Sequence, residues 1–308
     1  MSTAHPKTLM EAVNYFADPD VCHEYMKAIK WPDGEVCCPK CGSVNVGEIK
    51  SRRMFQCREK GCRKQFSVKV GTIFEDSSLP LSKWFVAVWV IANSKNGVSS
   101  CELARTIGVT QKSAWHMLHR IRLAMQTKSF RKIEGEVEGD ETYIGGRYSN
   151  MHKAKKAKMP KGRGTVGKTV VQGLIERGGE VRAKVVPDTK AKTLQAIVRE
   201  NVQPGAEVFT DTAAGYHGLQ ADYIHEMIDH AIKYVDGKVH TNTMENFWAL
   251  LKRSLGGTYV SVAPEHLDAY LDEQVERFNA RKLDDGGRFV RVMGRVLGRR
   301  LTWADLTR

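Results

Sequence analysis

The chain has 308 residues, a length that predicts two or three domains. Lysine and arginine number 48 against 35 acidic residues, so the net charge is +13 and the pI is near 9.4. This excess favours a polyanionic partner, because each neutralised phosphate releases counterions. The longest apolar run, residues 85–92, is too short to span a bilayer, and the N-terminus has no signal pattern. We therefore expect a cytoplasmic protein with no membrane partner.

Two close cysteine pairs lie in residues 35–75. Cys38 and Cys41 form one pair, and Cys57 and Cys62 form the other, with about fifteen residues between the pairs. In a reducing compartment such cysteines are metal ligands rather than disulfides, and this spacing suits one tetrahedral zinc held by four thiolates. We predict a zinc ribbon with one structural Zn²⁺. The remaining cysteines are not expected to be ligands, and two of them are expected to be buried core thiols: Cys22 and Cys101.

The next segment predicts helices, the last two of which are joined by a tight turn. Ser99 caps the first of these two, with Glu102 completing a capping box, and Gly108 ends it. Thr110 caps the second, residues 111–125. One face of this helix carries the polar side chains expected to bind DNA: Gln111, Lys112, Ser113, His116 and Arg120. The pattern is typical of a helix-turn-helix with its second helix in a major groove, and a helical hairpin used only for packing is the alternative.

From Gly135 onward the pattern changes to short β-branched runs. Strands are expected over residues 135–143, 168–174 and 180–186, followed by a helix over 191–202 and a fourth strand over 207–210. This order is that of a ribonuclease-H-like core, in which the first and fourth strands are neighbours.

Three acidic residues are placed to form one cluster. Asp140 in the first strand and Asp211 at the end of the fourth should meet, and Glu245 on a later helix can complete the group. Three carboxylates at one sheet edge suit two Mg²⁺ (or Mn²⁺) ions per active site, and two such ions can activate a nucleophile and stabilise the leaving oxygen of a phosphodiester. Lys252 follows Glu245 by seven positions, on the same helix face, where it could hold a DNA phosphate.

The segment after Asp140, residues 147–168, is dense in lysine, glycine and arginine. We predict a basic insertion that tracks DNA, and a solvated loop is the alternative. Its candidate DNA-binding residues are Lys153, Lys155, Lys156, Lys158, Lys161 and Arg163. Glu141 should point to the opposite strand face from Asp140, as a solvated residue or a neighbour of the metal ligands. Trp248 should lie in the core.

Several blocks together resemble a known family. They are residues 137–146 (VEGDETYIGG), 209–211 (FTD) with Tyr216, 240–248 (HTNTMENFW), 252–253 (KR), 257–259 (GTY) and the tail block E-x3-R-F-N at 273–279. In this order they resemble insertion-sequence transposases that join a zinc ribbon to a catalytic domain with the acidic DDE triad. The resemblance covers about residues 20–285.

The resemblance implies metal-dependent cleavage of DNA at the ends of an insertion sequence and transfer of the 3′ hydroxyl into a target. It implies double-stranded DNA as the partner, a homo-oligomer on that DNA, and Asp140 and Asp211 as metal ligands. The third position in this group is asparagine or glutamate, followed by a lysine, so Asn242 competes with Glu245 for this role. We favour Glu245, because a carboxylate is the better ligand for a hard cation.

The predicted fold class is therefore multidomain α+β and α/β. Residues 1–78 are assigned to N-terminal helices and the zinc ribbon, 79–130 to a small helical helix-turn-helix domain, and 131–308 to a ribonuclease-H-like mixed-sheet catalytic domain. Two other functions stay open. One is a DNA-binding regulator or domesticated transposase without strand transfer, and the other is a branched-DNA nuclease. The presence of all the acids of the cluster favours the transposase.

Overall fold

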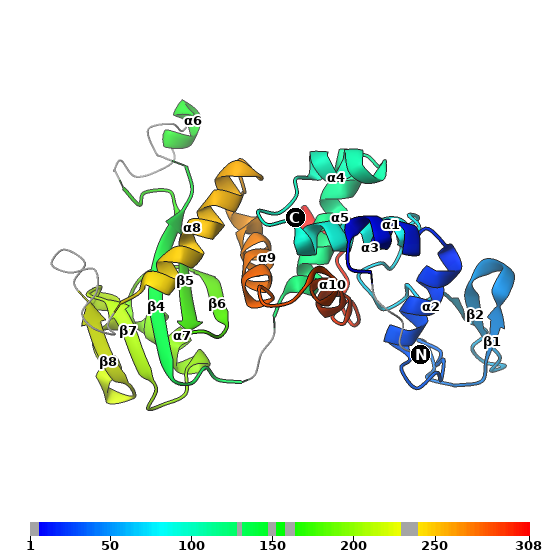
Figure 1. Ribbon diagram of the computed structural model, residues 1–308, viewed down its shortest axis with the longest axis horizontal. Helices are drawn as coiled ribbons and strands as arrows, with labels where there is room; N and C mark the ends of the chain where they lie inside the picture. Colours follow the sequence, from blue (N-terminus) through cyan, green and yellow to red (C-terminus); the bar gives the residue numbers. More distant parts are fainter. Residues whose placement is uncertain (1–5, 128–130, 147–151, 158–163, 229–239) are drawn as a thin grey trace. The chain divides into compact units, whose positions relative to one another are not determined.

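The structure, a computed structural model of the chain, describes residues 6–127, 131–146, 152–157, 164–228 and 240–308 (Figure 1). The chain divides into two compact units, which we describe separately: unit 1 is residues 1–126 with 280–308, and unit 2 is residues 127–279. In the described ranges, no helix is long and apolar enough to cross a membrane.

Unit 1 combines a helical body with a small antiparallel sheet. The helices are α1 (Leu9–Tyr15), α2 (Pro19–Lys30), α3 (Leu81–Asn93), α4 (Ser100–Ile107), α5 (Gln111–Met125), α10 (Asp285–Met293) and α11 (Trp303–Leu306). The strands β1 (Val46–Ile49), β2 (Met54–Cys57) and β3 (Gln65–Phe66) pair in that order, with the short helix η1 (Lys50–Arg52) between the first two. The sheet is the ribbon that the cysteine pairs predicted.

The ribbon and the helices share one hydrophobic core. Phe55 and Phe66 of the ribbon are buried and pack against Trp31, which follows α2. Helix α3 is apolar on most of its surface and buries Trp84 and Phe85 in the same core. A ribbon this small cannot bury its own aromatic side chains, so it uses the neighbouring helices. Residues 1–78 and 79–126 therefore fall within one compact unit rather than in the two domains expected.

The C-terminal residues 280–308 return to unit 1, whereas we expected the catalytic domain to extend to residue 308. The reason is helix α10, which packs on α3: the ring centre of the fully buried Phe289 lies 5.4 Å from the ring centre of Trp89. The side chain of Asn93 also donates a hydrogen bond to the carbonyl of Asp285 (3.2 Å). The sequence shows an amphipathic helix here, but amphipathicity alone does not tell which core covers its apolar face.

Helices α4 and α5 form with Ser99, Gly108 and Thr110 at the predicted cap positions, and of the predicted capping box the structure shows the bond to Ser99. The Ser99 hydroxyl accepts from the Glu102 amide, and Gly108 adopts the left-handed conformation (φ 62°) that ends α4. Thr110 accepts from the Ser113 amide at the start of α5. These local signals fix the bounds of α5 as expected, because each cap satisfies a backbone group that a helix end leaves unpaired.

Unit 2 is a mixed sheet covered by helices. Its strands are β4 (Glu136–Ile144), β5 (Thr169–Glu176), β6 (Val181–Val186), β7 (Glu207–Asp211) and β8 (Ile224–Ile228). Its helices are α6 (Lys153–Lys156), α7 (Ala191–Asn201), α8 (Asn242–Gly257) and α9 (Leu267–Asn279), with short 3-10 turns η3 (Ala214–Tyr216), η4 (Leu219–Ala221) and η5 (Pro264–His266).

The sheet order is β6-β5-β4-β7-β8, with β4 parallel to β7 and antiparallel to β5. The first and fourth predicted strands are therefore neighbours, and the predicted fold class is confirmed. The fifth strand, β8, pairs parallel to β7 and was not predicted. Helix α7 covers one face of the sheet through Leu194 and Val198, and α8 and α9 cover the other through Phe247 and Leu271 (Figure 1).

Helix α9 also closes the outer edge of the sheet. The backbone amide of Val181 on β6 donates to the side-chain oxygen of Asn279 (2.8 Å), whose amide group donates back to the Val181 carbonyl (3.0 Å). The amide of Val185 donates to a carboxylate oxygen of Asp268 (3.1 Å). Both ends of α9 are thus fastened to β6, and side chains take the place of a further strand.

Candidate active site

The sheet register brings two of the predicted acids together. Gly139 on β4 pairs with Thr210 on β7 in parallel, so the next residues, Asp140 and Asp211, lie side by side where the two strands end their pairing. An oxygen of Asp211 accepts from the amide of Ala213 (3.0 Å), which holds its carboxylate at the end of β7. This is the meeting of the first and fourth strands that the sequence predicted.

Helix α8 lies over Asp140. The indole nitrogen of Trp248 donates to one carboxylate oxygen of Asp140 (2.9 Å), so Trp248 is buried as expected but also contacts the site. Burial first, then the charge of Asp211 and, as a smaller contribution, the charge of Glu245 in the first turn of α8 together raise the pKa of Asp140 to about 6. Three negative charges therefore act on one another in this cluster, as at a site built for cations.

The three predicted acids do not converge on one point in the structure. Within the described ranges, the groups of at least three possible ligands whose atoms all lie within 4.8 Å of one another do not include Asp140, Asp211 and Glu245. Two ions in a shared site stand about 3.5–4 Å apart, so their ligands need not converge on one point. Carboxylate oxygens are the ligands that Mg²⁺ and Mn²⁺ prefer.

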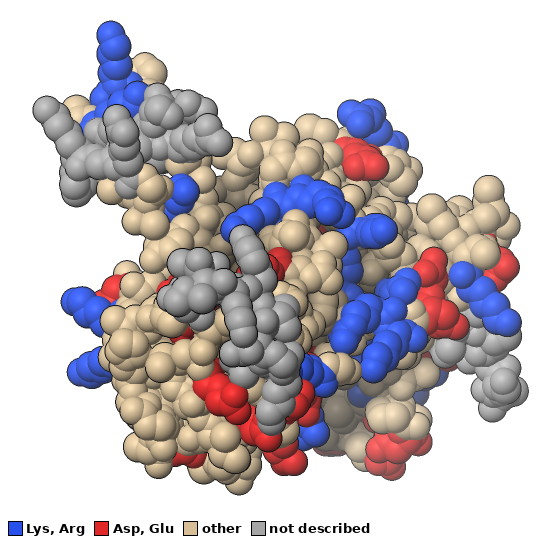
Figure 2. All heavy atoms as spheres, turned by 60° about the vertical axis from the view of Figure 1, so that its left-hand side comes forward, with Lys and Arg blue, Asp and Glu red and all other residues tan. Residues whose placement is uncertain are grey.

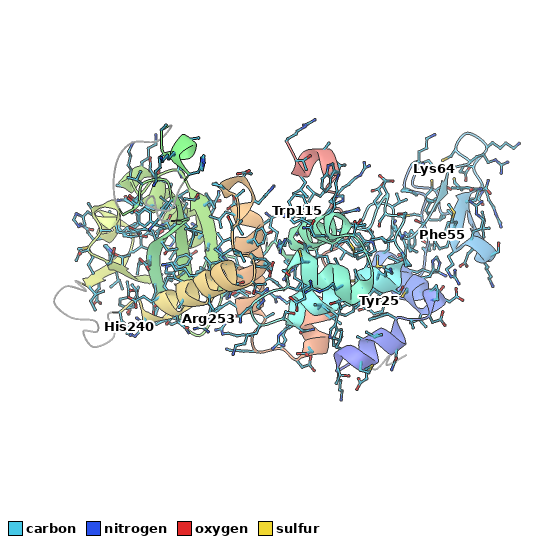
Figure 3. All side chains as sticks on the ribbon, turned by 90° about the horizontal axis from the view of Figure 1, so that it is seen from above. Tyr25, Phe55, Lys64, Trp115, His240 and Arg253 are labelled. Atoms are coloured by element: carbon cyan, nitrogen blue, oxygen red, sulfur yellow. The ribbon has the colours of Figure 1, made fainter. Side chains whose placement is uncertain are left out.

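The candidates on α8 are solvent-accessible. Asn242 is the first residue of the helix, and Glu245 lies one turn further, with both side chains exposed. Lys252 is exposed two turns beyond Glu245. His240 lies two residues before the helix, and Arg253 lies on it (Figure 3). The charge of Glu245 contributes to the raised pKa of Asp140, and the choice between Glu245 and Asn242 for the third position stays a prediction.

Glu141 occupies the strand face opposite Asp140, as expected, but it is partly buried rather than solvated. Burial raises its pKa to about 7, and the charges of Asp211 and Asp140 contribute. The hydroxyl of Tyr216, a fully buried residue of η3, faces this carboxyl, and its own pKa is raised well above the ordinary range, first by its burial. The site therefore has a fourth carboxyl on its other side.

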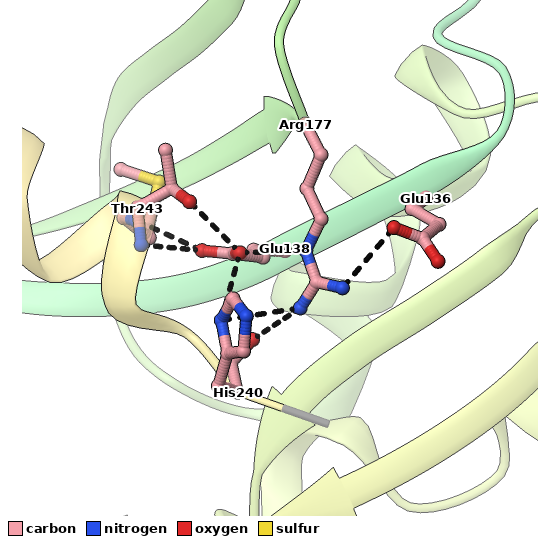
Figure 4. A network of polar contacts seen from close by, with 6 residues as sticks. Glu136, Glu138, Arg177, His240 and Thr243 are labelled. Carbon is pink, nitrogen blue, oxygen red and sulfur yellow. Dashed lines mark hydrogen bonds and ion pairs between the residues drawn. The ribbon is translucent and has the colours of Figure 1, made fainter. Parts of the chain in front are cut away.

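Glu138 is a buried carboxylate that the sequence analysis did not select. It is fully buried two residues before Asp140 and accepts hydrogen bonds from the amides of Thr243 (2.9 Å) and Met244 (3.0 Å) in the first turn of α8 (Figure 4). Arg177 donates to its other oxygen (2.8 Å). Strand alternation would have placed Glu138 on the face of Asp140, but nothing local showed its partners more than a hundred positions away.

Gly173 was also missed. It pairs with Asp140 across β4 and β5, and a Cβ atom there would stand 2.4 Å from the terminal carbon of Met244 and 2.7 Å from the ring of Trp248. The absent side chain lets α8 lie directly on the sheet beside Asp140. A glycine inside a strand pattern was the available signal, since it often marks such a close approach.

The four predicted cysteines converge in the ribbon. The sulfur atoms of Cys38 and Cys62 are 3.7 Å apart, those of Cys41 and Cys57 are 3.6 Å apart, and all four lie within 4.8 Å of one another. Zinc–sulfur bonds of about 2.3 Å in a tetrahedron require sulfur atoms about 3.8 Å apart. The donor set therefore fits one zinc ion. Cys22 is buried as expected, but Cys101 is exposed and is not a core thiol.

The proposed DNA face of α5 is narrower than expected. Gln111 and Lys112 are exposed, and Ser113 and His116 are partly buried. Arg120 is buried, with 5% of its surface exposed, and donates a hydrogen bond to the Glu75 carbonyl, so the expectation that it faces DNA is wrong. Its position on the helix was compatible with both the buried and the exposed face. In the structure its guanidinium carbon lies 5.3 Å from the centre of the Trp84 ring, on the buried face.

The C-terminal segment covers part of the same face. The ring of Trp303 lies 4.4 Å from the ammonium nitrogen of Lys112 and 5.6 Å from the ring of Trp115, which is labelled in Figure 3. The Leu301 carbonyl lies 3.3 Å from a ring nitrogen of His116. The outward side of α5 is thus shared between its own first two turns and the residues around α11.

The basic insertion is described only in part. Lys153 is exposed and Lys156 partly exposed on the short helix α6, whose basic side chains stand out at the top of Figure 2. Lys158, Lys161 and Arg163 lie outside the described residues, as does the side chain of Lys155. The DNA-tracking role of this segment stays a prediction.

The chain is similar to proteins of mobile elements. A family profile described as an ISXO2-like transposase domain matches residues 132–279, and a transposase zinc-ribbon profile matches residues 18–65. A protein of transposable element ISH50 from Halobacterium salinarum is 31% identical over 259 residues, which cover 79% of this chain and 85% of that protein. A transposase-like protein of Haemophilus influenzae is 35% identical over 101 residues, 32% of this chain and 81% of its own length.

Among solved structures, a pre-cleavage Mos1 transpososome aligns with 91% of this chain and 93% of its own, at 13% identity and a TM-score of 0.27. A similarity this low supports no conclusion about fold or function.

Proposed function

Because this chain belongs to the ISXO2-like transposase family, we propose that it cuts DNA at the ends of an insertion sequence and joins the 3′ hydroxyls to a target, with metal ions in the active site. The observation that carries the proposal is the cluster around Asp140. Its carboxylate lies beside that of Asp211 and accepts a hydrogen bond from the Trp248 indole, and the charge of Glu245 contributes to its raised pKa.

The chain's own residues divide the work of the reaction. Asp140, Asp211 and Glu245 hold the divalent cations, and Trp248 fixes one oxygen of Asp140 so that its carboxylate keeps a single orientation. When bound, two Mg²⁺ ions make a water or hydroxyl oxygen a stronger nucleophile and stabilise the leaving oxygen. Lys252, exposed on the same face of α8 as Glu245, holds a phosphate of the DNA strand near the cluster.

Unit 1 recognises the ends of the element. Cys38, Cys41, Cys57 and Cys62 hold one zinc ion, which stabilises a ribbon too small to fold on apolar burial alone. The first turns of α5, with Gln111 at their start, enter a major groove. The partner is double-stranded DNA, in accord with the net charge of +13, and copies of the chain gather on it as a homo-oligomer, because two ends must be joined in one reaction.

The test is strand cleavage on a DNA fragment that carries the element's ends. Asp140→Asn and Asp211→Asn should each abolish Mg²⁺- or Mn²⁺-dependent cleavage while binding to the end sequence survives, because each replaces an anionic ligand with a neutral one. Glu207→Gln is the matched control, since Glu207 starts the strand that Asp211 ends. If both aspartate variants still cut DNA, the two-metal reading fails and a DNA-binding regulator takes its place.

The third ligand needs its own comparison. Glu245→Gln should lower the cleavage rate by orders of magnitude, because it removes a charge beside the cations. Asn242→Ala should cost about tenfold, the size expected for a residue that only orients a ligand. The reverse ranking would assign the third position to Asn242 and leave Glu245 with a structural role.

A further inference from the structure

We propose that Glu138 is a positioning residue of the active site: its buried carboxylate fastens the first turn of α8 to β4 and thereby sets where Glu245 stands relative to Asp140. The inference rests on the proposed function, since it concerns the placement of a metal ligand.

Helix α8 depends on Glu138 for its cap. Its own N-cap residue, Thr241, makes no capping bond with its side chain. One oxygen of Glu138 accepts from the amides of Thr243 (2.9 Å) and Met244 (3.0 Å), the backbone groups that an N-cap side chain ordinarily satisfies. The Thr243 hydroxyl donates to the other oxygen (3.0 Å). A strand side chain therefore supplies the cap, and the positive end of the helix favours its charge.

The path from this cap to the reacting centre is short on both sides. Along β4, Glu138 is two residues from Asp140, and the two side chains lie on the same strand face. Along α8, the capped amides belong to the two residues directly before Glu245. Asp140 and Glu245 are thus connected through the backbone of β4, the buried side chain of Glu138 and the first turn of α8. A displacement of the Glu138 carboxylate should therefore displace Glu245 by a similar amount.

The Glu138 carboxylate has hydrogen-bond partners for both of its oxygens, but it contributes little to the free energy of folding. Arg177 donates to it (2.8 Å), and a ring nitrogen of His240 lies 3.2 Å from the same oxygen (Figure 4). A buried ion pair roughly offsets its own desolvation cost, so an apolar residue would serve packing as well. What an apolar residue would not provide is a fixed direction for the first turn of α8. Glu138 thus acts on geometry.

Arg177 extends the arrangement to the strand of the second aspartate. Its guanidinium lies 4.3 Å from the ring centre of Phe209, two residues before Asp211 on β7, and it pairs with Glu136 (3.1 Å). Strand β4, strand β7 and the start of α8 are therefore joined around one guanidinium and one carboxylate, beside the three acids that they deliver.

The experiment compares two acids of the same strand in the full-length protein. Glu138→Asp keeps the charge but is one methylene too short to reach both Arg177 and the helix amides. Glu136→Gln is the matched control, because Glu136 lies on the same face and pairs with the same arginine, whereas the bonds to the first turn of α8 come from Glu138. Thr243→Val removes a single bond to Glu138 without changing the side-chain volume.

Two measurements report on position rather than on folding. Binding of Mn²⁺, followed by loss of the free-ion EPR signal, should weaken about 10- to 100-fold in Glu138→Asp, about fivefold in Thr243→Val and less than twofold in Glu136→Gln. Hydrogen exchange of the Thr243 and Met244 amides should accelerate in Glu138→Asp. Cleavage by Glu138→Asp should recover at high Mn²⁺, which a globally damaged protein would not show.

The outcomes separate the two proposals. If Glu138→Asp binds Mn²⁺ as the wild type does, the positioning role is wrong, whatever the wild type does to DNA. If the wild type binds Mn²⁺ with the predicted dependence on Glu138 but does not cut element ends, the positioning role stands and the proposed function fails. If Glu138→Asp does not fold, Thr243→Val decides, and unchanged Mn²⁺ binding in that variant overturns the inference.

Discussion

Replacing Asp140 with asparagine should make the metal-free protein more stable, although the same change should abolish cleavage. The ordinary pKa of an aspartate is 3.8, and burial, with the charge of Asp211 next, raises that of Asp140 to about 6. The folded protein therefore holds this proton more tightly than the unfolded chain. Stability falls as the pH rises from about 4 to about 6 and stays reduced above that range. The ionised carboxylate costs about 3 kcal/mol at neutral pH.

Asparagine removes this cost but also loses an interaction. Asp140 accepts from both the Trp248 indole and the Glu141 amide through its two oxygens. An amide side chain has one acceptor oxygen, so its N–H group would face one of these two donors, and such a buried unpaired N–H costs about 1 kcal/mol. The net gain is about 2 kcal/mol. For a compact unit of this size it corresponds to a rise of about 4–8 °C in the unfolding midpoint.

The assay is thermal unfolding followed by circular dichroism, without added Mg²⁺ and without a chelator, so that the ribbon keeps its metal. At pH 7.5 Asp140→Asn should unfold at the higher temperature, and at pH 4 its advantage should vanish. Added Mg²⁺ should stabilise the wild type and leave the variant unchanged. A variant that is less stable at pH 7.5, or a difference that is equal at both pH values, would show that burial and the charge of Asp211 do not raise the pKa of Asp140 as described.

Three further changes test other parts of the chain. Protein purified without a tag should contain about one zinc per chain, and Cys57→Ser should lose it, as measured by atomic absorption; a zinc-free wild type with all seven thiols reactive would contradict the ribbon assignment. Gly173→Ala should destabilise the protein by about 1–3 kcal/mol and slow cleavage with DNA binding unchanged, because its Cβ would displace Trp248; an unchanged midpoint would mean that α8 has room to shift. Trp303→Ala should release the Lys112 ammonium from the Trp303 ring and steepen the salt dependence of DNA binding by about one unit. An unaltered slope would place that lysine away from phosphates.

Features fixed by neighbouring residues could be predicted from the sequence. The bounds of α5 follow from a threonine cap, and the cysteine spacing alone indicated the ribbon. The pairing of β4 with β7 followed from the order of strands and helices, and it placed Asp140 beside Asp211. The family expected from these blocks is confirmed by the matching profiles and by the relative from Halobacterium salinarum.

Features that depend on distant partners could not be predicted. Arg120 was assigned to the DNA face because a helix pattern does not say how wide the buried face is, and here Trp84 and the Glu75 carbonyl take it inside. The role of Glu138 is set by amides more than a hundred positions later. Residues 280–308 belong to unit 1 because the core of that unit accommodates the apolar face of α10. The local sequence of α10 does not indicate which of the two cores this face packs against.

The fastening of α9 onto β6 has a consequence for chains that are still being made. Strand β6 leaves the ribosome well before Asp268 and Asn279 are made. Until then the amides of Val181 and Val185 have no side-chain acceptor and lie on an open sheet edge. An open edge pairs readily with a strand of another chain, and incompletely made chains are the ones most exposed to such association. Truncated copies of the gene that end before α9 should therefore yield insoluble products rather than inactive competitors for the DNA ends.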